Sequence, residues 1–211
     1  MSYIFWLDIL GTAVFAISGV LLAARTQMDP IGALVLGVIT AIGGGTIRDI
    51  ILNNGPIFWV VDSTDLMIAI VASFFSMIFI RFTTFKYPRY LLSILDAIGL
   101  AVFVGIGVNK AIASHVNELV AVCMGVLTGV GGGVIRDVLA REIPMVFRVD
   151  IYATACIIGG VCHMMAYQFF SLPLQYATLF GIAVTLVIRL MAIFWHLKLP
   201  ILSAKSGINR S

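Results

Sequence analysis

The sequence predicts an all-α integral membrane protein with seven transmembrane helices. Hydrophobic residues make up 61% of the chain and charged residues only 11%, whereas soluble domains carry about 25% charged residues. The mean hydropathy is +1.11. Apolar runs long enough to cross ~30 Å of hydrocarbon lie at roughly 4–24, 31–52, 64–82, 91–109, 116–140, 152–170 and 174–196. These runs are apolar on every side and do not alternate, which favours helices over the strands of a membrane barrel.

The seven runs account for nearly the whole chain. We therefore predict one transmembrane domain over residues 1–198, followed by a short cytoplasmic tail over 199–211. The leading segment "MSYIFWLD" carries an acid and no base, so the first run is interpreted as a true helix and not as a cleaved signal peptide. The three cysteines fall inside predicted spans and are odd in number, which gives no support to a disulfide framework.

An internal repeat determines the predicted architecture. Residues 8–62 align with residues 96–150 at a constant offset of 88, so that "DILGTAVFAISG" lies over "DAIGLAVFVGIG" and "GGGTIRD" lies over "GGGVIRD". Shared hydrophobicity does not place Asp, Arg, Pro and a glycine triplet in one register, so the pattern indicates a duplication. The first repeat covers about 4–82 and the second about 91–170, while the seventh helix at about 174–196 stands outside both.

The number of spans in each repeat sets their relative orientation. Three is odd, so the two copies should enter the membrane from opposite sides as an inverted repeat. The distribution of basic residues assigns the sides. The connections after the first, third and fifth spans, together with the C-terminal end, hold all of the lysines and arginines except Arg48 and Lys110. This asymmetry predicts a multi-pass protein with its N-terminus outside and its C-terminus in the cytoplasm.

Two glycine triplets lie inside the second and fifth spans. They are Gly43, Gly44 and Gly45, and the matched Gly131, Gly132 and Gly133, with Thr40 and Thr128 just before them. Each glycine costs ~1 kcal/mol relative to alanine in a helix, so three together predict a broken helix. Freed backbone groups are tolerated in a membrane where they line an aqueous cavity, which predicts a pathway. The alternative is close helix packing through small residues, with each threonine bonded to its own helix.

Charged residues inside the spans are the second set of candidates. They are Asp8, Arg48, Asp49, Asp96, Arg136 and Asp137. A charge at the bilayer centre costs at least ~2.5–3.5 kcal/mol and usually faces a cavity or a partner. We interpret this set as charges of a pore or of its gate. The alternative is a structural pair at a helix end, where the arginine reaches toward the headgroups and the aspartate caps or pairs with it.

Other kinds of site have little support. A phosphate-binding loop needs Gly-Lys-Ser/Thr and a dinucleotide turn needs Gly-x-Gly-x-x-Gly, and neither triplet fits these patterns. The three histidines do not have metal-ligand spacing. Neither Gly-x-Ser-x-Gly nor a cysteine–histidine arrangement occurs. We therefore expect a protein that is not an enzyme, with no catalytic residue, no cofactor, no metal site and no nucleic-acid partner.

The doubled Gly-Gly-Gly-x-x-Arg-Asp motif in two three-helix repeats, with a seventh helix and a length near 200 residues, resembles the bacterial relatives of the trimeric intracellular cation (TRIC) channels. The resemblance covers residues 1–198. It implies a homotrimer in the bacterial inner membrane, in contact with membrane lipids. Each subunit would have its own pore through the first, second, fourth and fifth spans. The Lys-Glu-Val motif that animal members use for inositol lipids is absent here.

The resemblance also implies a function. Members of this family conduct monovalent cations, so K⁺ or Na⁺ is the expected permeant ion, K⁺ above all. The glycine triplets, Arg48 and Arg136 are the site residues that the resemblance carries over, while Asp8 and Asp96 come from the analysis of the spans. The same bacterial family is also described as a glycine transporter domain. A carrier for a small zwitterion such as glycine is therefore the alternative.

Overall fold

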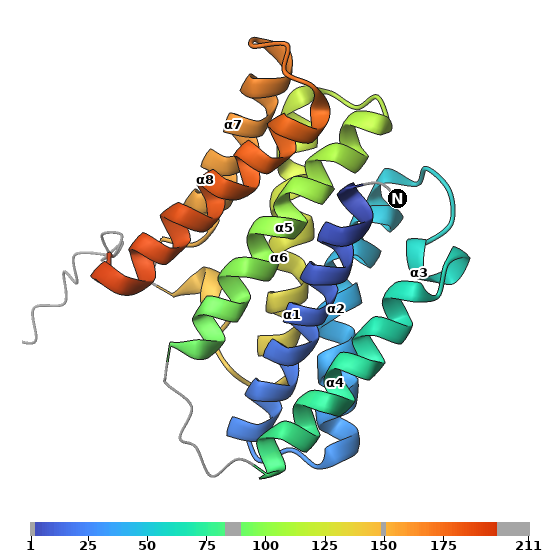
Figure 1. Cartoon of the computed structure of the whole chain (residues 1–211), viewed down its shortest axis with the longest axis vertical. Helices are drawn as coiled ribbons and strands as arrows, with labels where there is room; N and C mark the ends of the chain where they lie inside the picture. The colour runs from blue at the N-terminus through green and yellow to red at the C-terminus, as the bar shows by residue number, and fades with distance from the viewer. Residues whose placement is uncertain (1–2, 83–89, 149–150, 198–211) are drawn as a thin grey trace, which may run out of the picture.

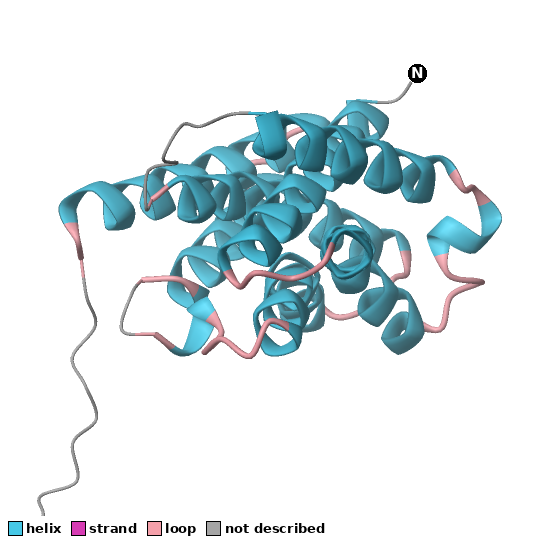
Figure 2. Ribbon diagram, turned by 90° about the horizontal axis from the view of Figure 1, so that it is seen from below, coloured by secondary structure: helices cyan, strands magenta, loops and turns pink. Residues whose placement is uncertain are grey.

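The computed structural model describes residues 3–82, 90–148 and 151–197, which leaves the predicted tail outside the described residues. The described residues form seven long helices and two short ones (Figure 1). They are α1 (Tyr3–Arg25), α2 (Pro30–Leu52), α3 (Phe58–Val61), α4 (Thr64–Phe82), α5 (Leu91–Ala113), α6 (Glu118–Leu139), the 3₁₀ turn η1 (Met145–Phe147), α7 (Ala153–Gln168) and α8 (Leu174–Trp195). Figure 2 shows only helices and loops in the described part of the chain. The predicted all-α class is confirmed.

Six of the seven long helices are long and apolar enough to cross a membrane, namely α1, α2, α4, α5, α6 and α8. The expected span at 152–170 is shorter, because α7 has 16 residues and extends only ~24 Å. It ends where the amides of Phe169 and Phe170 both bond the carbonyl oxygen of Met165. Ser171 then takes a positive φ of 49°, a left-handed residue that commonly ends a helix.

Local sequence explains where the second helix begins and ends. Asp29 caps α2, because its carboxylate accepts the Gly32 amide at 2.7 Å, and Pro30 occupies the first turn, where its missing N–H is not needed. At the other end, Asn53 takes a left-handed conformation with φ 45°. These signals set α2 at 23 residues, which is enough to cross the hydrocarbon core.

The long helices alternate in direction along the chain, and α1 runs opposite to α5 (Figure 1). Helix α5 is the most buried and packs against α1, α6, α7 and α8, while α2 packs against α1, α4 and α6. Helix α4 exposes most of its side chains, including Phe74, Phe75 and Phe79. Helices α1, α2, α5 and α6 therefore form the inner group of the bundle.

The predicted helix breaks are wrong. Helices α2 and α6 continue without interruption through both glycine triplets. The reason is the close contact of the two helices. A Cβ on Gly44 would overlap the carbonyl oxygen of Thr128, and a Cβ on Gly132 would overlap the carbonyl oxygen of Thr40. The glycines remain helical and allow two backbones to touch, which is the packing role that small residues have in membrane helices.

Equivalent positions of the two repeats make reciprocal contacts. Phe15 of α1 faces Gly99 of α5, while Phe103 of α5 faces Gly11 of α1. The two aromatic rings lie 5.2 Å apart between their centroids. Phe15 aligns with Phe103 and Gly11 aligns with Gly99 at the offset of 88. The two contacts are therefore related by the internal duplication.

Candidate functional site

Arg136 forms the centre of a buried charge cluster near the end of α6. Its Nη1 donates to Asp96 Oδ1 of α5 at 2.9 Å and to Ser18 Oγ of α1 at 3.0 Å. Its Nε donates to the neighbouring Asp137 Oδ1 at 2.9 Å. We call Ser18, Asp96, Arg136 and Asp137 the Arg136 cluster. Both Arg136 and Asp96 are 0% exposed, so the charges are neutralised by contact with each other and not by water.

The second carboxylate oxygens of Asp137 and Asp96 differ in their hydrogen bonds. Asp137 Oδ2 accepts the backbone amide of Met145 at 2.9 Å, which fixes η1 against the end of α6. Asp96 Oδ2 is buried and has no hydrogen-bond partner among the described residues. The Tyr152 hydroxyl lies beside this carboxylate. A buried carboxylate oxygen without a donor is a strong acceptor for a cation or a water molecule.

A second cluster forms near the end of α2. Arg48 holds Asp49 through Nε and Nη2, both 2.8 Å from Oδ1. Asp49 Oδ2 accepts the backbone amide of Phe58 at 2.9 Å and pairs with Lys110 Nζ of α5 at 3.3 Å. The two cations also lie against the Phe58 ring, at 5.6 Å and 5.8 Å from its centroid. We call Arg48, Asp49, Phe58 and Lys110 the Arg48 cluster.

The two clusters lie at opposite ends of the bundle, because α2 and α6 run in opposite directions (Figure 1). They are not equivalent. In the Arg136 cluster the arginine itself forms the ion pair between helices, with Asp96. In the Arg48 cluster that pair is formed by Lys110 and Asp49, and among the described residues Arg48 forms an ion pair with Asp49 alone. Asp8, the counterpart of Asp96, is half-buried and interacts with Arg48 over a longer distance. The Lys110 side chain is 43% exposed, so the Arg48 cluster is accessible while the Arg136 cluster is closed.

The glycines and threonines lie between the clusters. Gly43 and Gly131 face the ends of Ile135 and Ile47, Gly45 faces the Phe58 ring, and Gly133 faces the Asp96 carboxylate and the Tyr152 hydroxyl. Both threonines are fully buried. Thr40 donates to the Leu36 carbonyl at 2.6 Å and Thr128 to the Met124 carbonyl at 2.5 Å. Their hydroxyls therefore serve their own helices in this structure.

Side chains fill the space between α1, α2, α5 and α6. Phe15, which is 1% exposed, packs against Gly99 of α5 and Gly132 of α6. Leu100 and Val104 complete this layer of the core. The space between these helices beside Gly99 and Gly132 is therefore occupied by Phe15.

Sequence reasoning missed several members of this site. Lys110, Ser18 and Tyr152 were not candidates, although Lys110 was one of two basic residues on its side of the membrane. Phe15 was visible only as a residue repeated at position 103. The signal that could have found Ser18 and Lys110 is their departure from the repeat, since they align with Ile106 and Leu22.

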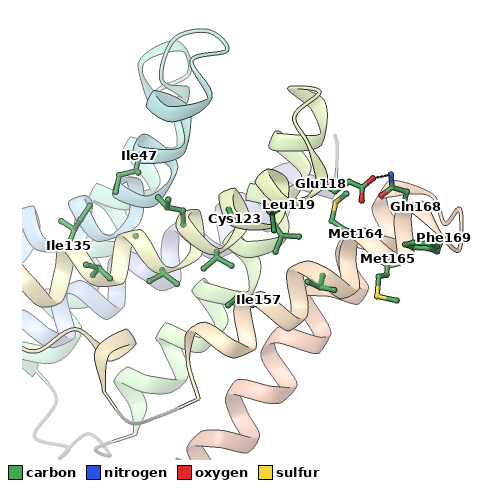
Figure 3. Close-up of a pocket in the computed structure, with 17 residues that line it drawn as sticks. Ile47, Glu118, Leu119, Cys123, Ile135, Ile157, Met164, Met165, Gln168 and Phe169 are labelled. Carbon is green, nitrogen blue, oxygen red and sulfur yellow. Dashed lines mark hydrogen bonds between the residues drawn. The ribbon is translucent and has the colours of Figure 1, made fainter. Parts of the chain in front are cut away.

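An apolar groove of about 840 Å³ lies away from the clusters (Figure 3). Helices α6 and α7 form its walls, and Ile47 of α2 lies at one end. Its polar members are at the opposite end, where Gln168 donates to Glu118 at 2.5 Å. Such a surface suits acyl chains or another apolar helix and not an ion.

These features define a class of protein, a polytopic α-helical membrane protein with a buried arginine–aspartate cluster at each end of one inner helix group. A family model described as "Glycine transporter" matches residues 5–81 and 93–168, and the chain belongs to this family. The two matched stretches begin 88 residues apart, which agrees with the offset of the internal repeat.

Curated relatives and solved structures extend this assignment. The chain is 64% identical over 197 residues to "UPF0126 inner membrane protein YadS" of Escherichia coli K12, covering 93% of this chain and 95% of the relative. It is 52% identical over 199 residues to a "UPF0126 membrane protein" of Vibrio cholerae, covering 94% and 82%. The TRIC trimeric intracellular cation channel orthologue from Rhodobacter sphaeroides is 33% identical with a TM-score of 0.86, covering 93% of this chain and 100% of that structure. The predicted relationship to bacterial TRIC homologues is confirmed.

Proposed function

We propose that the chain is a channel for monovalent cations, chiefly K⁺, and that it works as a homotrimer with one pathway in each subunit between α1, α2, α5 and α6. The observation that carries the proposal is the pair of arginine–aspartate clusters at opposite ends of these four helices. The similarity to the Rhodobacter sphaeroides TRIC orthologue over its whole length supports the cation and the trimer.

The acidic groups supply the attraction for cations. Asp8 and Asp49 lie at one mouth of the proposed pathway, and Asp96 and Asp137 lie at the other. Arg48 and Arg136 each neutralise an adjacent carboxylate, so neither arginine presents an unpaired positive charge to a passing ion. Asp96 Oδ2, which has no hydrogen-bond partner among the described residues, is an acidic oxygen that can replace part of the ion's hydration shell once this mouth opens.

Opening requires movement of Phe15. Its ring fills the middle of the inner helix group, and a hydrophobic constriction of this kind blocks ions by excluding water. If the ring leaves this space, Gly99 and Gly132 cannot fill it, because glycine has no side chain. The two glycines thus make the centre of the pathway depend on one aromatic residue.

The proposed topology is an inverted pair of three-helix repeats with a seventh helix, in one domain over 1–198. The opposite directions of α1 and α5 (Figure 1) and the reciprocal contacts of Phe15 and Phe103 support this arrangement. The surplus of basic residues at one end supports an N-terminus outside and a C-terminus in the cytoplasm. The relatives named as inner membrane proteins support the bacterial inner membrane as the location.

Reconstitution in a planar bilayer tests the proposal. With purified protein and a KCl gradient we expect unitary currents that reverse near the K⁺ equilibrium potential. Material purified in the same way from cells without the expression plasmid is the control. A complete absence of unitary currents under voltage, from protein that migrates as a folded oligomer, would overturn the channel proposal.

The second candidate is a carrier for a small zwitterion, which the description of the matching family model favours. A helix break could have held the substrate carboxylate at an exposed helix N-terminus, but α2 and α6 are continuous. A carrier therefore needs the charged clusters themselves as its binding groups. Saturable uptake of labelled glycine into proteoliposomes, without unitary conductance, would decide for the carrier.

A further inference from the structure

A pocket of about 280 Å³ opens at the end of the bundle that carries the Arg136 cluster. It lies between the start of α5 and the end of α8, and η1 closes one side. Its polar lining consists of Tyr90, Ser93, Arg148, Arg189 and His196. Among the described residues that line it there are two arginines and no acidic side chain, so the pocket attracts anions.

Arg189 of α8 lines this pocket and holds a donor without a partner among the described residues. The residue is 3% exposed, and its Nη1 donates to the carbonyl oxygen of Ile151 at 2.7 Å. Its guanidinium carbon lies 4.4 Å from the centroid of the Tyr152 ring, which fixes the side chain. Its Nε is buried and has no hydrogen-bond partner among the described residues. A buried, charged N–H group in this state favours an incoming acceptor oxygen.

The start of α5 adds further donors at the same place. Tyr90 precedes the helix and makes no side-chain capping bond. The first backbone amides of an α-helix have no intrahelical acceptor, and the positive end of the dipole of this 23-residue helix lies beside the pocket, which Tyr90 and Ser93 line. The Ser93 hydroxyl lines the same wall. This combination of backbone amides, hydroxyl and guanidinium matches the oxygens of a phosphate group.

Arg148 lies at the exposed rim of the pocket. Its side chain is 47% exposed, pairs with Glu142 at 3.1 Å and donates its Nε to the Ile143 carbonyl at 3.0 Å. Both contacts are exposed, so it can exchange them for a bound anion at little cost. The apolar part of the lining, which we call the apolar wall, consists of Met145, Ala192 and Ile193. The pocket therefore offers both polar and apolar side chains.

We propose that this pocket binds the phosphate group of an anionic phospholipid, with the apolar wall against its glycerol and first acyl carbons. The position at the end of two membrane-spanning helices places the site at headgroup depth. Free phosphate shares the same recognition chemistry, and the experiment below separates the two sources. The site does not depend on what the protein transports, so its test and the test of conduction can fail separately.

Binding here would reach the Arg136 cluster through Met145. This residue lines the pocket, donates its amide to Asp137 and places its sulfur 3.8 Å from Arg136 Nη2. A ligand that holds η1 therefore also holds two members of that cluster.

Native mass spectrometry and thermal unfolding of the full-length protein in detergent test the proposal. We expect phosphatidylglycerol to remain bound and to raise the Tm, while phosphatidylcholine with the same acyl chains does neither. Arg148→Gln and Arg189→Gln should each weaken phosphatidylglycerol binding by about tenfold, the loss expected for one charge-assisted hydrogen bond. Arg141→Gln, an exposed arginine at the same end that does not line the pocket, is the matched control and should bind as the native protein does.

Millimolar inorganic phosphate distinguishes the source of the anion. A Tm increase equal to that with phosphatidylglycerol would support the site and assign it to a free anion. Equal binding of phosphatidylglycerol and phosphatidylcholine, or native binding by the Arg148→Gln variant, would overturn the proposal. If Arg189→Gln does not fold, Arg148→Gln decides alone, because its half-exposed ion pair with Glu142 contributes little to stability.

Discussion

Gly44 of α2 lies directly against the backbone carbonyl of Thr128 in α6, so close that a methyl group on Gly44 would overlap the oxygen. The mirror contact joins Gly132 to the carbonyl of Thr40. Both oxygens belong to backbone that cannot move aside as a side chain can. The close crossing of α2 and α6 therefore requires glycine at positions 44 and 132, because any other residue would place a Cβ atom against the carbonyl oxygen of the other helix.

Substitution of this glycine should destabilise the protein. We expect Gly44→Ala to lower the free energy of unfolding by about 1–3 kcal/mol, the usual effect of overpacking a tight core. Gly43→Ala is the matched control, because its Cβ would meet only the flexible end of Ile135 at 2.9 Å, and alanine is the better helix former by ~1 kcal/mol. Thermal unfolding in detergent measures both. A native Tm for Gly44→Ala would contradict the packing role of the triplet.

Removal of the ring that fills the centre should open the pathway. We expect Phe15→Ala to raise the K⁺ conductance or the open probability, because the Phe15 ring fills the space beside Gly99 and Gly132. The lost ring should also lower stability by about 3–5 kcal/mol. Phe103→Ala is the comparison, since it loses a similar ring that faces Gly11 of α1. Equal currents in native and Phe15→Ala channels in planar bilayers would remove Phe15 from the pathway.

The two arginines should differ in their effects. Arg136→Gln leaves Asp96 and Asp137 without their shared partner, and breaking such a buried pair costs about 3–5 kcal/mol. Arg48→Gln should cost less, because Asp49 keeps Lys110 and the Phe58 amide. We also expect Arg136→Gln to raise K⁺ conductance more than Arg48→Gln does, since it frees two carboxylates at one mouth.

A double variant separates charge from packing in this cluster. Asp96→Asn combined with Arg136→Gln removes both members of the pair, so we expect it to recover part of the stability that Arg136→Gln loses. Unfolding temperatures and single-channel currents measured on the same preparations give both effects. Normal currents in Arg48→Gln and in Arg136→Gln, with only the stability reduced, would show that both arginines have a structural role.

The positive charge of Lys110 should reduce K⁺ conductance by repelling cations at the mouth beside the Arg48 cluster. We expect Lys110→Gln to change stability by less than about 1 kcal/mol, because its pair with Asp49 is half-exposed and such pairs contribute little. The loss of a positive charge should raise K⁺ conductance at low salt. At about 1 M KCl the difference should disappear, because the screening length falls to roughly 3 Å. A difference that persists at high salt would indicate a steric effect instead.

Hydropathy was sufficient to predict the all-α class and six of the seven spans, because these are properties of long segments, and the doubled motif was sufficient to predict the family. The role of the triplets could not be derived in the same way. Whether a glycine breaks a helix or admits a neighbour depends on what lies opposite, and the Thr128 carbonyl comes from another helix. The general rule against three glycines in a helix was outweighed by packing.

The asymmetry of the two clusters was also outside the reach of the repeat. Matching positions show that Arg48 and Arg136 are counterparts, but they do not show which partners each arginine has. In the structure they differ because Ser18 and Lys110 occupy positions where the other half has Ile106 and Leu22. The positions at which the two repeats differ, and not those at which they match, indicate which of the two clusters is accessible.

The two glycine contacts lie one helical turn apart on each helix, about 6 Å along the axis. They restrain sliding of α2 along α6 but leave a pivot at the crossing. Arg48 and Arg136 each follow that pivot by one turn, on helices that run in opposite directions (Figure 1). A rotation of α2 relative to α6 about the crossing would therefore displace Arg48 and Arg136 together, at opposite ends of the bundle. Such a motion couples the two ends, so one cannot move in this way without the other.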